Sequence, residues 1–287
     1  MLSPFRFRND LICIKRRAAC VYVSSRLVRT LIKPYLISAL KLKTGVLSKN
    51  KPYLTFENFK IFGFNADTLV YLYRDVFLSG TYFFKTNILN PVIIDCGANI
   101  GMSVLFFKWL YPNSIIYAFE PSPSIFEMLQ KNISANKLEN VFCYNVALAD
   151  KTATVQFFEP DGIAGSLTGS LSHERNDGTP VEVQAMPLSA FIRENNITSI
   201  DYLKMDIEGA ETAVINEMAA AQTMDLIKQA GIEYHHQIAG QNASLGHFLK
   251  TVELAGFYYS LFAEGQPSKT GEMQDVHLFL NKQQKGL

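Results

Sequence analysis

The stretch Val92-Ile-Ile-Asp-Cys-Gly-Ala-Asn-Ile-Gly101 decides the fold of this chain. Its β-branched residues predict a buried strand at 92–96, and its two glycines predict a tight turn that leads directly into a helix. Asp95 would lie at the carboxyl end of this strand, where open α/β sheets bind their ligands. The spacing G-x-x-x-G differs from the G-x-G-x-x-G fingerprint of dinucleotide-binding folds. We therefore expect a ligand crevice at this point, without a cradle for a pyrophosphate.

Short apolar runs alternate with helical stretches from residue 91 onward, which indicates an α/β fold with a mostly parallel sheet. The expected strands are 92–96, 115–119, 141–146, 202–206, 231–234, 257–262 and 276–281, and the expected helices are 102–110, 124–136, 188–195, 211–218 and 245–255. The last two strands are joined by turn-rich residues and no helix, which predicts an antiparallel hairpin. Between the third and fourth strands, segments 154–158 and 181–186 bracket a long loop rich in Gly, Ser and Thr. Such a loop is a candidate for a functional or mobile element.

Three regions are expected: a basic, partly helical extension at 1–52, a small cap segment at 53–90 and a Rossmann-like domain at 91–287. In the cap, residues 59–64 favour a strand, and Asp67 is placed to N-cap a helix over 69–77. Aromatic residues crowd this segment. They indicate core packing, although a lid over a substrate would use the same residue types.

The extension is strongly basic. Residues 1–51 contain twelve Lys and Arg but one acid, Asp10, although the whole chain has a net charge of +1. Leu27, Val28, Leu31 and Ile32 follow helical spacing up to Pro34, which we expect to end the helix. A basic helix favours peripheral contact with a membrane surface or an anionic partner. The alternative is an arm that packs on the acidic remainder of the chain, or on a second subunit of a homo-oligomer.

The composition is that of a globular cytoplasmic protein. Of the 287 residues, 48% are apolar and 18% charged, which suffices to bury a core. The cysteines Cys13, Cys20, Cys96 and Cys143 have no paired spacing, as expected in a reducing compartment. No apolar run approaches the ~20 residues that span a bilayer, and the start of the chain lacks a secretory signal pattern.

An acid follows the second expected strand, in Tyr117-Ala-Phe-Glu-Pro121. At such a strand end the carboxylate of Glu120 can accept both hydroxyls of a ribose. The alternative is an exposed glutamate without a ligand. After the third strand, Asn145 and the backbone at 146–147 would meet the edge of an adenine, although an ordinary strand-end turn explains these residues nearly as well.

The fourth strand leads into Ile200-Asp-Tyr-Leu-Lys-Met-Asp-Ile-Glu-Gly-Ala-Glu211. If the strand continues far enough, Lys204, Asp206 and Glu208 share one face beside the crevice. Asp206 would then orient a substrate hydroxyl, act as a base or help to hold a divalent cation.

The fifth strand ends in Glu233-Tyr-His-His-Gln237, where His235 faces the same side as Glu233. A histidine is a natural general base near neutral pH, and the alternative is a structural histidine bonded to the backbone. With Asp206 and Glu208, these residues also form a mixed nitrogen and oxygen donor set that suits a divalent metal.

These segments together resemble the FkbM family of methyltransferases over about residues 54–236. The likeness is strongest at 95–101, 118–121 and 202–211, of which the last is distinctive and the first two occur across class I methyltransferases. It implies a Rossmann-like class I fold and an enzyme that O-methylates a hydroxyl of a sugar, glycolipid or related small molecule. The cofactor would be S-adenosylmethionine.

The expected cofactor-binding residues are Asp95, Gly97, Ala98, Asn99, Gly101, Glu120, Pro121, Asn145 and Ala147. Asp95 would receive the ammonium of the methionine moiety, directly or through water. The expected catalytic residues are Asp206, Glu208 and His235.

Two other functions stay open. A nucleic-acid methyltransferase would use the basic extension to hold RNA phosphates, but no Asn/Asp-Pro-Pro-Tyr/Phe motif follows the fourth strand. A methyltransferase-like scaffold without turnover is the non-enzyme alternative. Intact Asp95, Gly97, Gly101 and Glu120 argue against it.

Overall fold

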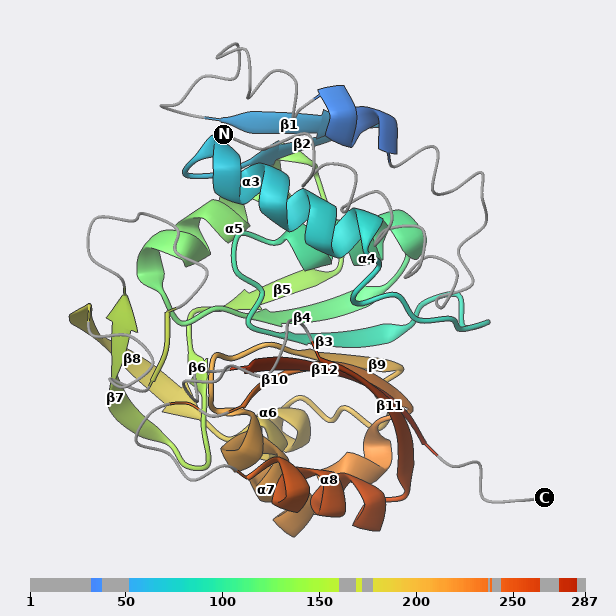
Figure 1. Cartoon of the computed structure of the whole chain (residues 1–287), viewed down its shortest axis with the longest axis vertical. Coiled ribbons are helices and arrows are strands. Elements are labelled where there is room, and N and C mark those ends of the chain that lie inside the picture. Colours follow the sequence, from blue (N-terminus) through green and yellow to red (C-terminus); the bar gives the residue numbers. More distant parts are fainter. Residues whose placement is uncertain are drawn as a thin grey trace.

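The computed structural model describes residues 32–37, 52–159, 169–171, 178–236, 238, 244–263 and 274–282. A seven-stranded sheet forms the centre (Figure 1), with the spatial order β11 (Phe257–Ala263), β12 (Gln274–Lys282), β10 (Gln229–His236), β9 (Tyr202–Met205), β3 (Val92–Cys96), β4 (Ile115–Phe119) and β5 (Val141–Tyr144). The strand pairs from β10 to β5 are parallel, whereas β12 pairs antiparallel with both β10 and β11. The predicted α/β sheet with its antiparallel C-terminal hairpin is confirmed.

Helices cover both faces of this sheet (Figure 1): α4 (Met102–Leu110) and α5 (Pro123–Ala135) on one face, and α6 (Leu188–Glu194), α7 (Glu211–Ala220) and α8 (Leu245–Leu254) on the other. Each face has its own apolar core. Helix α5 begins at Pro123 because the hydroxyl of Ser122 accepts a hydrogen bond from the backbone N–H of Ile125, and proline fits the first helical position. The five predicted helices are all present.

The insertion between β5 and β9 forms a second, three-stranded sheet of β6 (Ala147–Leu148), β8 (Thr179–Met186) and β7 (Ala153–Glu159). Both strands predicted for it are present. The loop that we expected to be functional or mobile lies mostly outside the described residues. Its described part, 169–171, returns to β7, where the backbones of Ser170 and Phe158 exchange hydrogen bonds of 2.8 and 3.1 Å.

The cap consists of a hairpin of β1 (Tyr53–Phe56) and β2 (Phe59–Phe62), followed by α3 (Ala66–Tyr73) and a π-helical turn, η1 (Arg74–Leu78). The predicted N-cap at Asp67 is wrong. Asn65 caps α3, because its side-chain oxygen accepts a 2.7 Å hydrogen bond from the N–H of Thr68, which lies three residues later. Asp67 lies in the first turn of the helix instead.

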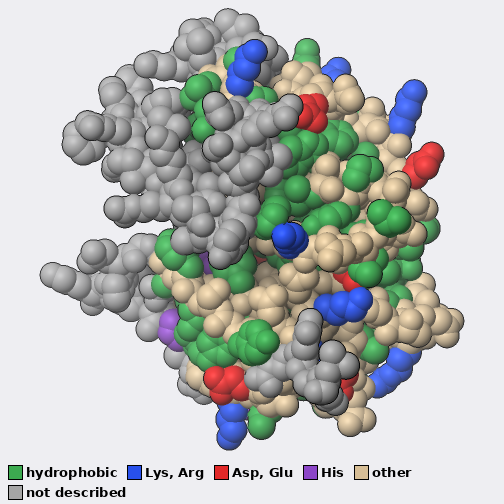
Figure 2. Space-filling view, turned by 90° about the vertical axis from the view of Figure 1, so that its right-hand side faces the viewer, with side chains coloured by type: hydrophobic (Ala, Val, Ile, Leu, Met, Phe, Trp, Pro, Cys, Tyr) green, Lys and Arg blue, Asp and Glu red, His purple; other side chains and the backbone are tan. Residues whose placement is uncertain are grey.

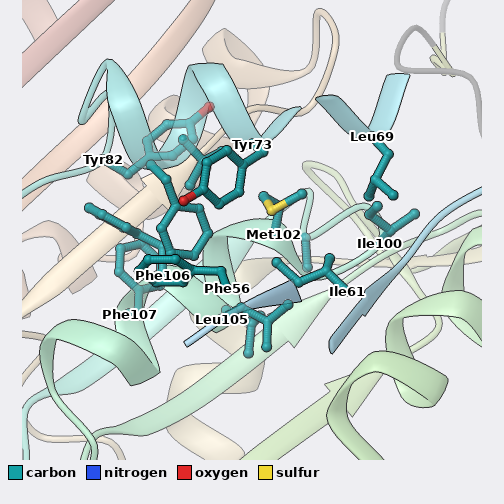
Figure 3. Close-up of a cluster of buried hydrophobic side chains, with 14 of the residues drawn as sticks. Phe56, Ile61, Leu69, Tyr73, Tyr82, Ile100, Met102, Leu105, Phe106 and Phe107 are labelled. Carbon is teal, nitrogen blue, oxygen red and sulfur yellow. The ribbon is translucent and has the colours of Figure 1, made fainter. Parts of the chain in front are cut away.

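Cap aromatics pack onto α4, which confirms their predicted role in the core (Figure 3). The ring of Phe77 lies between Tyr73, stacked at 5.0 Å, and Phe106, edge-on at 5.2 Å. Phe56 contacts Phe77 at 5.2 Å from the hairpin side. The cap therefore shares one apolar core with the sheet domain.

Of the basic extension, the structure describes residues 32–37. They are helical and include Pro34, so the prediction that Pro34 ends the helix is wrong. Proline has a helical φ, and it is tolerated in the first turn of a helix, where its missing N–H would have no intrahelical partner. Tyr35 is buried in the core that the cap shares with the sheet domain. Within the described part of the chain, no helix is long and apolar enough to cross a membrane.

Candidate active site

A cavity of about 250 Å³ lies where β3, β4, β9 and β10 end. Of the expected site residues, nine line it: Gly97, Ala98, Asn99, Glu120, Pro121, Ala147, Asp206, Glu208 and His235. Three others are not among its lining residues: Asp95, Gly101 and Asn145. The cavity thus lies at the carboxyl edge of the parallel strands, where α/β sheets bind ligands.

The glycine turn after β3 depends on a close backbone approach. Gly97 has a φ of +87°, and a Cβ at this position would lie 1.8 Å from the carbonyl oxygen of Asp206. No residue with a side chain fits there. The N–H groups of Gly97 and Ala98 donate to the carbonyl of Phe119 at 3.0 and 2.8 Å. This turn therefore joins the ends of β3, β4 and β9.

Glu120 lies at the wall of the cavity and is nearly fully buried. Its two carboxylate oxygens accept 2.9 Å hydrogen bonds from the backbone N–H groups of Asn99 and Ser122. Burial raises the pKa of Glu120 to about 7, although these two hydrogen bonds act in the opposite direction. The side-chain amide of Asn145 donates to the carbonyls of Glu120 and Pro121, both at 2.9 Å, so Asn145 supports this turn from outside.

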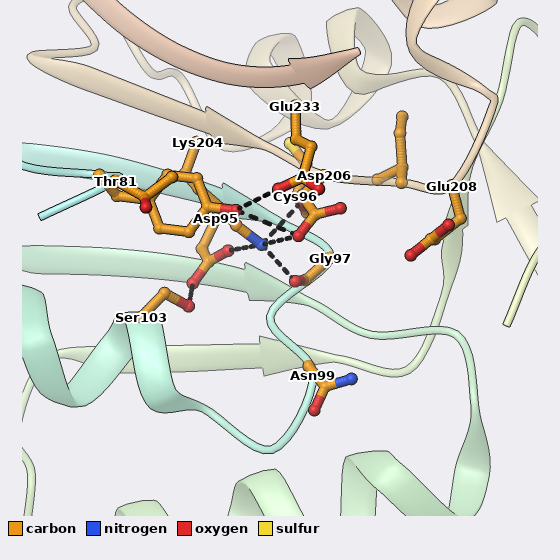
Figure 4. A network of polar contacts seen from close by, with 12 residues as sticks. Thr81, Asp95, Cys96, Gly97, Asn99, Ser103, Lys204, Asp206, Glu208 and Glu233 are labelled. Carbon is orange, nitrogen blue, oxygen red and sulfur yellow. Dashed lines mark hydrogen bonds and ion pairs between the residues drawn. The ribbon is translucent and has the colours of Figure 1, made fainter. Parts of the chain in front are cut away.

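A buried ion pair lies under the glycine turn (Figure 4). The Asp95 carboxylate accepts a 2.5 Å hydrogen bond from the Ser103 hydroxyl and lies 3.3 Å from the Lys204 ammonium. That ammonium also donates to the carbonyl of Gly97 and lies 3.8 Å from Asp206. Burial acts to lower the pKa of Lys204, but Asp95 and Asp206 outweigh it and raise the pKa. Asp95 therefore supports the turn through Lys204 and does not line the cavity.

His235 is held among carboxylates. Its Nδ1 lies 2.8 Å from Glu211, and its Nε2 lies 3.3 Å from Glu208 and 3.9 Å from Asp206. Burial acts to lower the pKa of His235, but Glu211 and Glu208 outweigh it and raise the pKa well above the ordinary value. An imidazolium has no lone pair to accept a proton, so this arrangement disfavours a general-base role. The alternative of a structural histidine assumed a backbone partner, whereas the observed partners of His235 are the carboxylates of Glu211 and Glu208.

Lys204, Asp206 and Glu208 all line the cavity, but not because they share one strand face. Strand β9 ends at Met205, and Glu208 has a left-handed φ of 52° in the turn that follows. The carbonyl of Glu208 accepts a 2.6 Å hydrogen bond from the Ser170 hydroxyl. The turn and the insertion, and not strand parity, therefore orient Glu208.

Some cavity residues were not predicted from the sequence. From the cap, Tyr82 donates its hydroxyl to Asp206 at 3.1 Å and lies 3.4 Å from Glu233. The π-helical turn adds Asp75, the insertion adds Phe157, and β12 adds Asp275. These residues come from several separate elements, and the sequence signals were the aromatic crowding of the cap and the long insertion, of which Phe157, Gly169 and Leu171 line the cavity.

Among the residues that the structure describes, two groups of three side chains have ligand atoms close enough together to hold a metal ion. They are Asp206 with Glu208 and His235, and Glu233 with His235 and Asp275, and the ligand atoms of each group lie within 4.8 Å of one another. In the first group, Nε2 of His235 already forms an ion pair with Glu208. A metal would have to displace a proton from this nitrogen.

The sheet with its antiparallel hairpin, the glycine turn and the acid at the end of β4 define a class I methyltransferase. The chain belongs to the FkbM methyltransferase family, because the model of the methyltransferase FkbM domain matches residues 95–259, more than half of the chain. It is therefore an enzyme, a methyltransferase that depends on S-adenosylmethionine.

Individual relatives are distant. Methyltransferase sdnD of Sordaria araneosa is 29% identical over 173 residues, which cover 50% of this chain and 67% of that protein. The 31-O-demethyl-FK506 methyltransferase FkbM of Streptomyces tacrolimicus is 26% identical, covering 72% of this chain and 88% of that protein. The 2-O-methyltransferase NoeI of Sinorhizobium fredii is 29% identical over 140 residues, which cover 44% of this chain and 56% of that protein.

The lining of the cavity suits the chemistry of the cofactor. Glu120 offers a fixed carboxylate for a ribose diol, and Ile125, Val146, Leu148 and Phe157 form an apolar wall next to it. A purine ring needs such a wall, and the diol needs acceptors.

Proposed function

We propose that this methyltransferase O-methylates a hydroxyl of a sugar, glycolipid or related small molecule. The observation that carries the proposal is the position of Asp206. Its carboxylate lines the cavity, while its own backbone carbonyl packs against Gly97 of the turn proposed to hold the cofactor. The names of two relatives, a 2-O-methyltransferase and a 31-O-demethyl-FK506 methyltransferase, refer to transfer to oxygen.

In this proposal the cofactor end of the cavity is the side of Glu120. Glu120 accepts the two ribose hydroxyls, and the apolar wall surrounds the adenine together with Ala147 and Pro121. The backbone from Gly97 to Asn99 borders the methionine moiety, supported from below by Asp95 through Lys204. When bound, the cofactor supplies a methyl group already activated by a sulfonium, so the protein has to supply alignment and a proton acceptor.

Asp206 is the proposed proton acceptor at the other end. Its carboxylate would orient the acceptor hydroxyl and hold the proton that the oxygen loses when the new oxygen–carbon bond forms. His235 would act as a fixed cation that keeps Glu208 and Glu211 in place and lies 3.9 Å from the Asp206 carboxylate.

The charge of this end favours an uncharged or cationic acceptor. Five carboxyl side chains of the described residues line it: Asp75, Asp206, Glu208, Glu233 and Asp275. The cations among the lining residues, Lys204 and His235, are already paired with acids. An acceptor phosphate would therefore meet repulsion, which weighs against the RNA alternative. On the face in Figure 2, the Lys and Arg side chains of described residues are scattered and form no groove for a nucleic acid.

A labelling experiment tests the proposal. The purified enzyme is incubated with S-adenosylmethionine carrying a deuterated methyl group and with small-molecule and glycolipid extracts, and labelled products are sought by mass spectrometry. We expect the label on an ether oxygen of a neutral or cationic compound. A parallel incubation contains RNA, and label that appears only on this RNA would favour the nucleic-acid alternative. Calorimetry that detects no binding of S-adenosylhomocysteine would favour the inactive scaffold.

Replacement of Asp206 by Asn tests the proposed base. The amide keeps the size of the side chain but cannot hold the proton, so we expect kcat to fall by about 100-fold or more. The affinity for S-adenosylhomocysteine, measured by calorimetry, should stay within about twofold because Asp206 borders the acceptor. A variant that methylates at the wild-type rate would remove Asp206 from this role.

A divalent metal bound by Asp206, Glu208, His235 and Glu233 is the second role proposed for the same cluster. Its support is the convergence of their ligand atoms. The measurement is methyl transfer after chelation and after readdition of Mg²⁺ or Mn²⁺. Full activity in chelator would exclude a catalytic metal and leave Asp206 to act alone.

A further inference from the structure

Tyr82 occupies an unusual position for a cap residue. It is 3% exposed, yet it lines the cavity beside the proposed base. Its hydroxyl lies 3.1 Å from Oδ2 of Asp206 and 3.4 Å from Oε2 of Glu233, and the Lys204 ammonium lies 5.2 Å from the centre of its ring. The residue thus reaches from the cap to the carboxylate on which the proposed chemistry depends.

The hydroxyl of Tyr82 acts as a donor at this position. The ordinary pKa of a tyrosine phenol is about 10, so the hydroxyl keeps its proton near neutral pH and can donate it in a hydrogen bond. A carboxylate is the strongest acceptor that this proton can find, and the hydrogen bond is charge-assisted. Tyr82 is therefore unsuited to act as the base itself.

The two oxygens of Asp206 have different surroundings. Oδ2 receives the Tyr82 hydrogen bond and lies 3.8 Å from the Lys204 ammonium. Oδ1 lies on the side of His235, 3.9 Å from its Nε2, which is beyond hydrogen-bond distance. Asp206 remains partly exposed, with 27% of its side-chain surface accessible. An acceptor hydroxyl can therefore reach Oδ1 while Oδ2 stays held.

We propose that Tyr82 is a positioning residue that fixes the Asp206 carboxylate through Oδ2 and so presents Oδ1 to the acceptor hydroxyl. This inference rests on the proposed function of Asp206. It also gives the cap a part in the reaction, because Tyr82 belongs to the cap. The cap lies before residues 95–259, which the family domain matches. The proton of the acceptor hydroxyl would pass to Oδ1, and the proton of Tyr82 would stay on its oxygen.

The test compares Tyr82→Phe with Tyr202→Phe. Both rings are buried, and both variants lose one hydroxyl and keep the ring. Tyr202 is a matched control because its hydroxyl has no hydrogen-bond partner among the described residues. Crystal structures of the wild type and both variants with S-adenosylhomocysteine give the orientation of Asp206, calorimetry gives the cofactor affinity, and kinetics give kcat and KM.

For Tyr82→Phe we expect the Asp206 carboxylate to rotate, kcat to fall by about 10- to 100-fold, and the cofactor affinity to stay within about twofold. Tyr202→Phe should keep both the orientation and kcat. An Asp206 carboxylate that keeps its orientation in Tyr82→Phe overturns the inference. If the wild type methylates no acceptor at all, the proposed function fails, but the orientation of Asp206 still decides the positioning role.

Discussion

Glu120 is the residue on which the proposed cofactor site depends most. Its carboxylate is fixed by two backbone N–H groups, and burial raises its pKa to about 7. A buried acid with such a pKa changes its charge within the physiological range. Ribose hydroxyls need the ionised form as an acceptor, so the site is sensitive to mild acidification.

We therefore predict that cofactor affinity falls as the pH falls below about 7. The pKa of Glu120 is raised, so at low pH a proton on the free carboxylate competes with the ribose hydroxyls. Above the pKa the carboxylate is ionised and this competition is absent. The dissociation constant should rise by up to about tenfold for each pH unit well below that pKa. Calorimetry with S-adenosylhomocysteine between about pH 5.5 and about pH 8 measures it. In Glu120→Gln, affinity should be low at every pH, and a variant as pH-dependent as the wild type would assign the effect to another group.

His235 provides a second prediction, on stability. Its pKa is raised, so its contribution is fully present below about pH 6.5, the unfolded value, and is lost as the pH rises through the folded value. His235→Gln leaves Glu208 and Glu211 without their buried cation, and we expect a loss of about 3–5 kcal/mol in the free energy of unfolding at pH 6. Urea denaturation at several pH values measures the gap from the wild type. A gap that widens as the pH rises would contradict a protonated His235.

At the scale of elements, the cap is joined to the sheet domain by two asparagines of the same helix. The side chain of Asn132 in α5 accepts from the N–H of Phe62 at 2.7 Å and donates to the carbonyls of Phe62 and Ile100 at 2.9 and 2.8 Å. Asn136, its C-cap, makes the corresponding pair of bonds to the backbone of Lys60 at 2.7 and 2.9 Å. Asn132 is fully buried, whereas the bonds of Asn136 to Lys60 are exposed.

This difference in burial predicts different costs of substitution. Asn132→Leu leaves the part-buried backbone groups of Phe62 and the buried carbonyl of Ile100 without their partner, so we expect a loss of about 2–4 kcal/mol in the free energy of unfolding. In Asn136→Leu, water can replace the lost bonds to Lys60, and the loss should be below about 1 kcal/mol. Equal losses in urea denaturation would show that the cap is not joined to α5 in this way.

The elements also show what the sequence could predict. Strands such as 92–96 and helices such as 102–110 have strong periodicity, so the predicted bounds agree with the observed bounds of β3 and α4. The N-cap at Asn65 was missed because two capping residues, Asn65 and Asp67, lie close together, and the local pattern does not choose between them. Tyr82 was missed as a site residue for another reason: its contact with Asp206 spans 124 positions and exists only through the packing of the cap.

At the scale of the whole molecule, the basic extension differs from the rest of the chain in charge but shares its apolar core. The basic residues are concentrated in 1–51, whereas carboxylates line the cavity. Yet Tyr35, within the basic extension, is buried in the core. The extension therefore cannot be treated as an appendage, and its removal up to residue 51 would expose apolar surface of the cap.

The role of the extension is therefore better tested by a charge variant than by a truncation. The seven basic residues before the described helix are Arg6, Arg8, Lys15, Arg16, Arg17, Arg26 and Arg29, and their replacement by Gln leaves Tyr35 in place. If the extension contacts a membrane, the wild type should bind vesicles that contain phosphatidylserine, with about 1 kcal/mol per basic residue near the surface, and high salt should release it. The Gln variant should lose this binding and keep its affinity for S-adenosylhomocysteine. Vesicle sedimentation tests the first point, and equal binding by both proteins would exclude a membrane role for these basic residues. Light scattering tests the alternative, because a wild-type dimer that the variant loses would assign the arm to subunit contact.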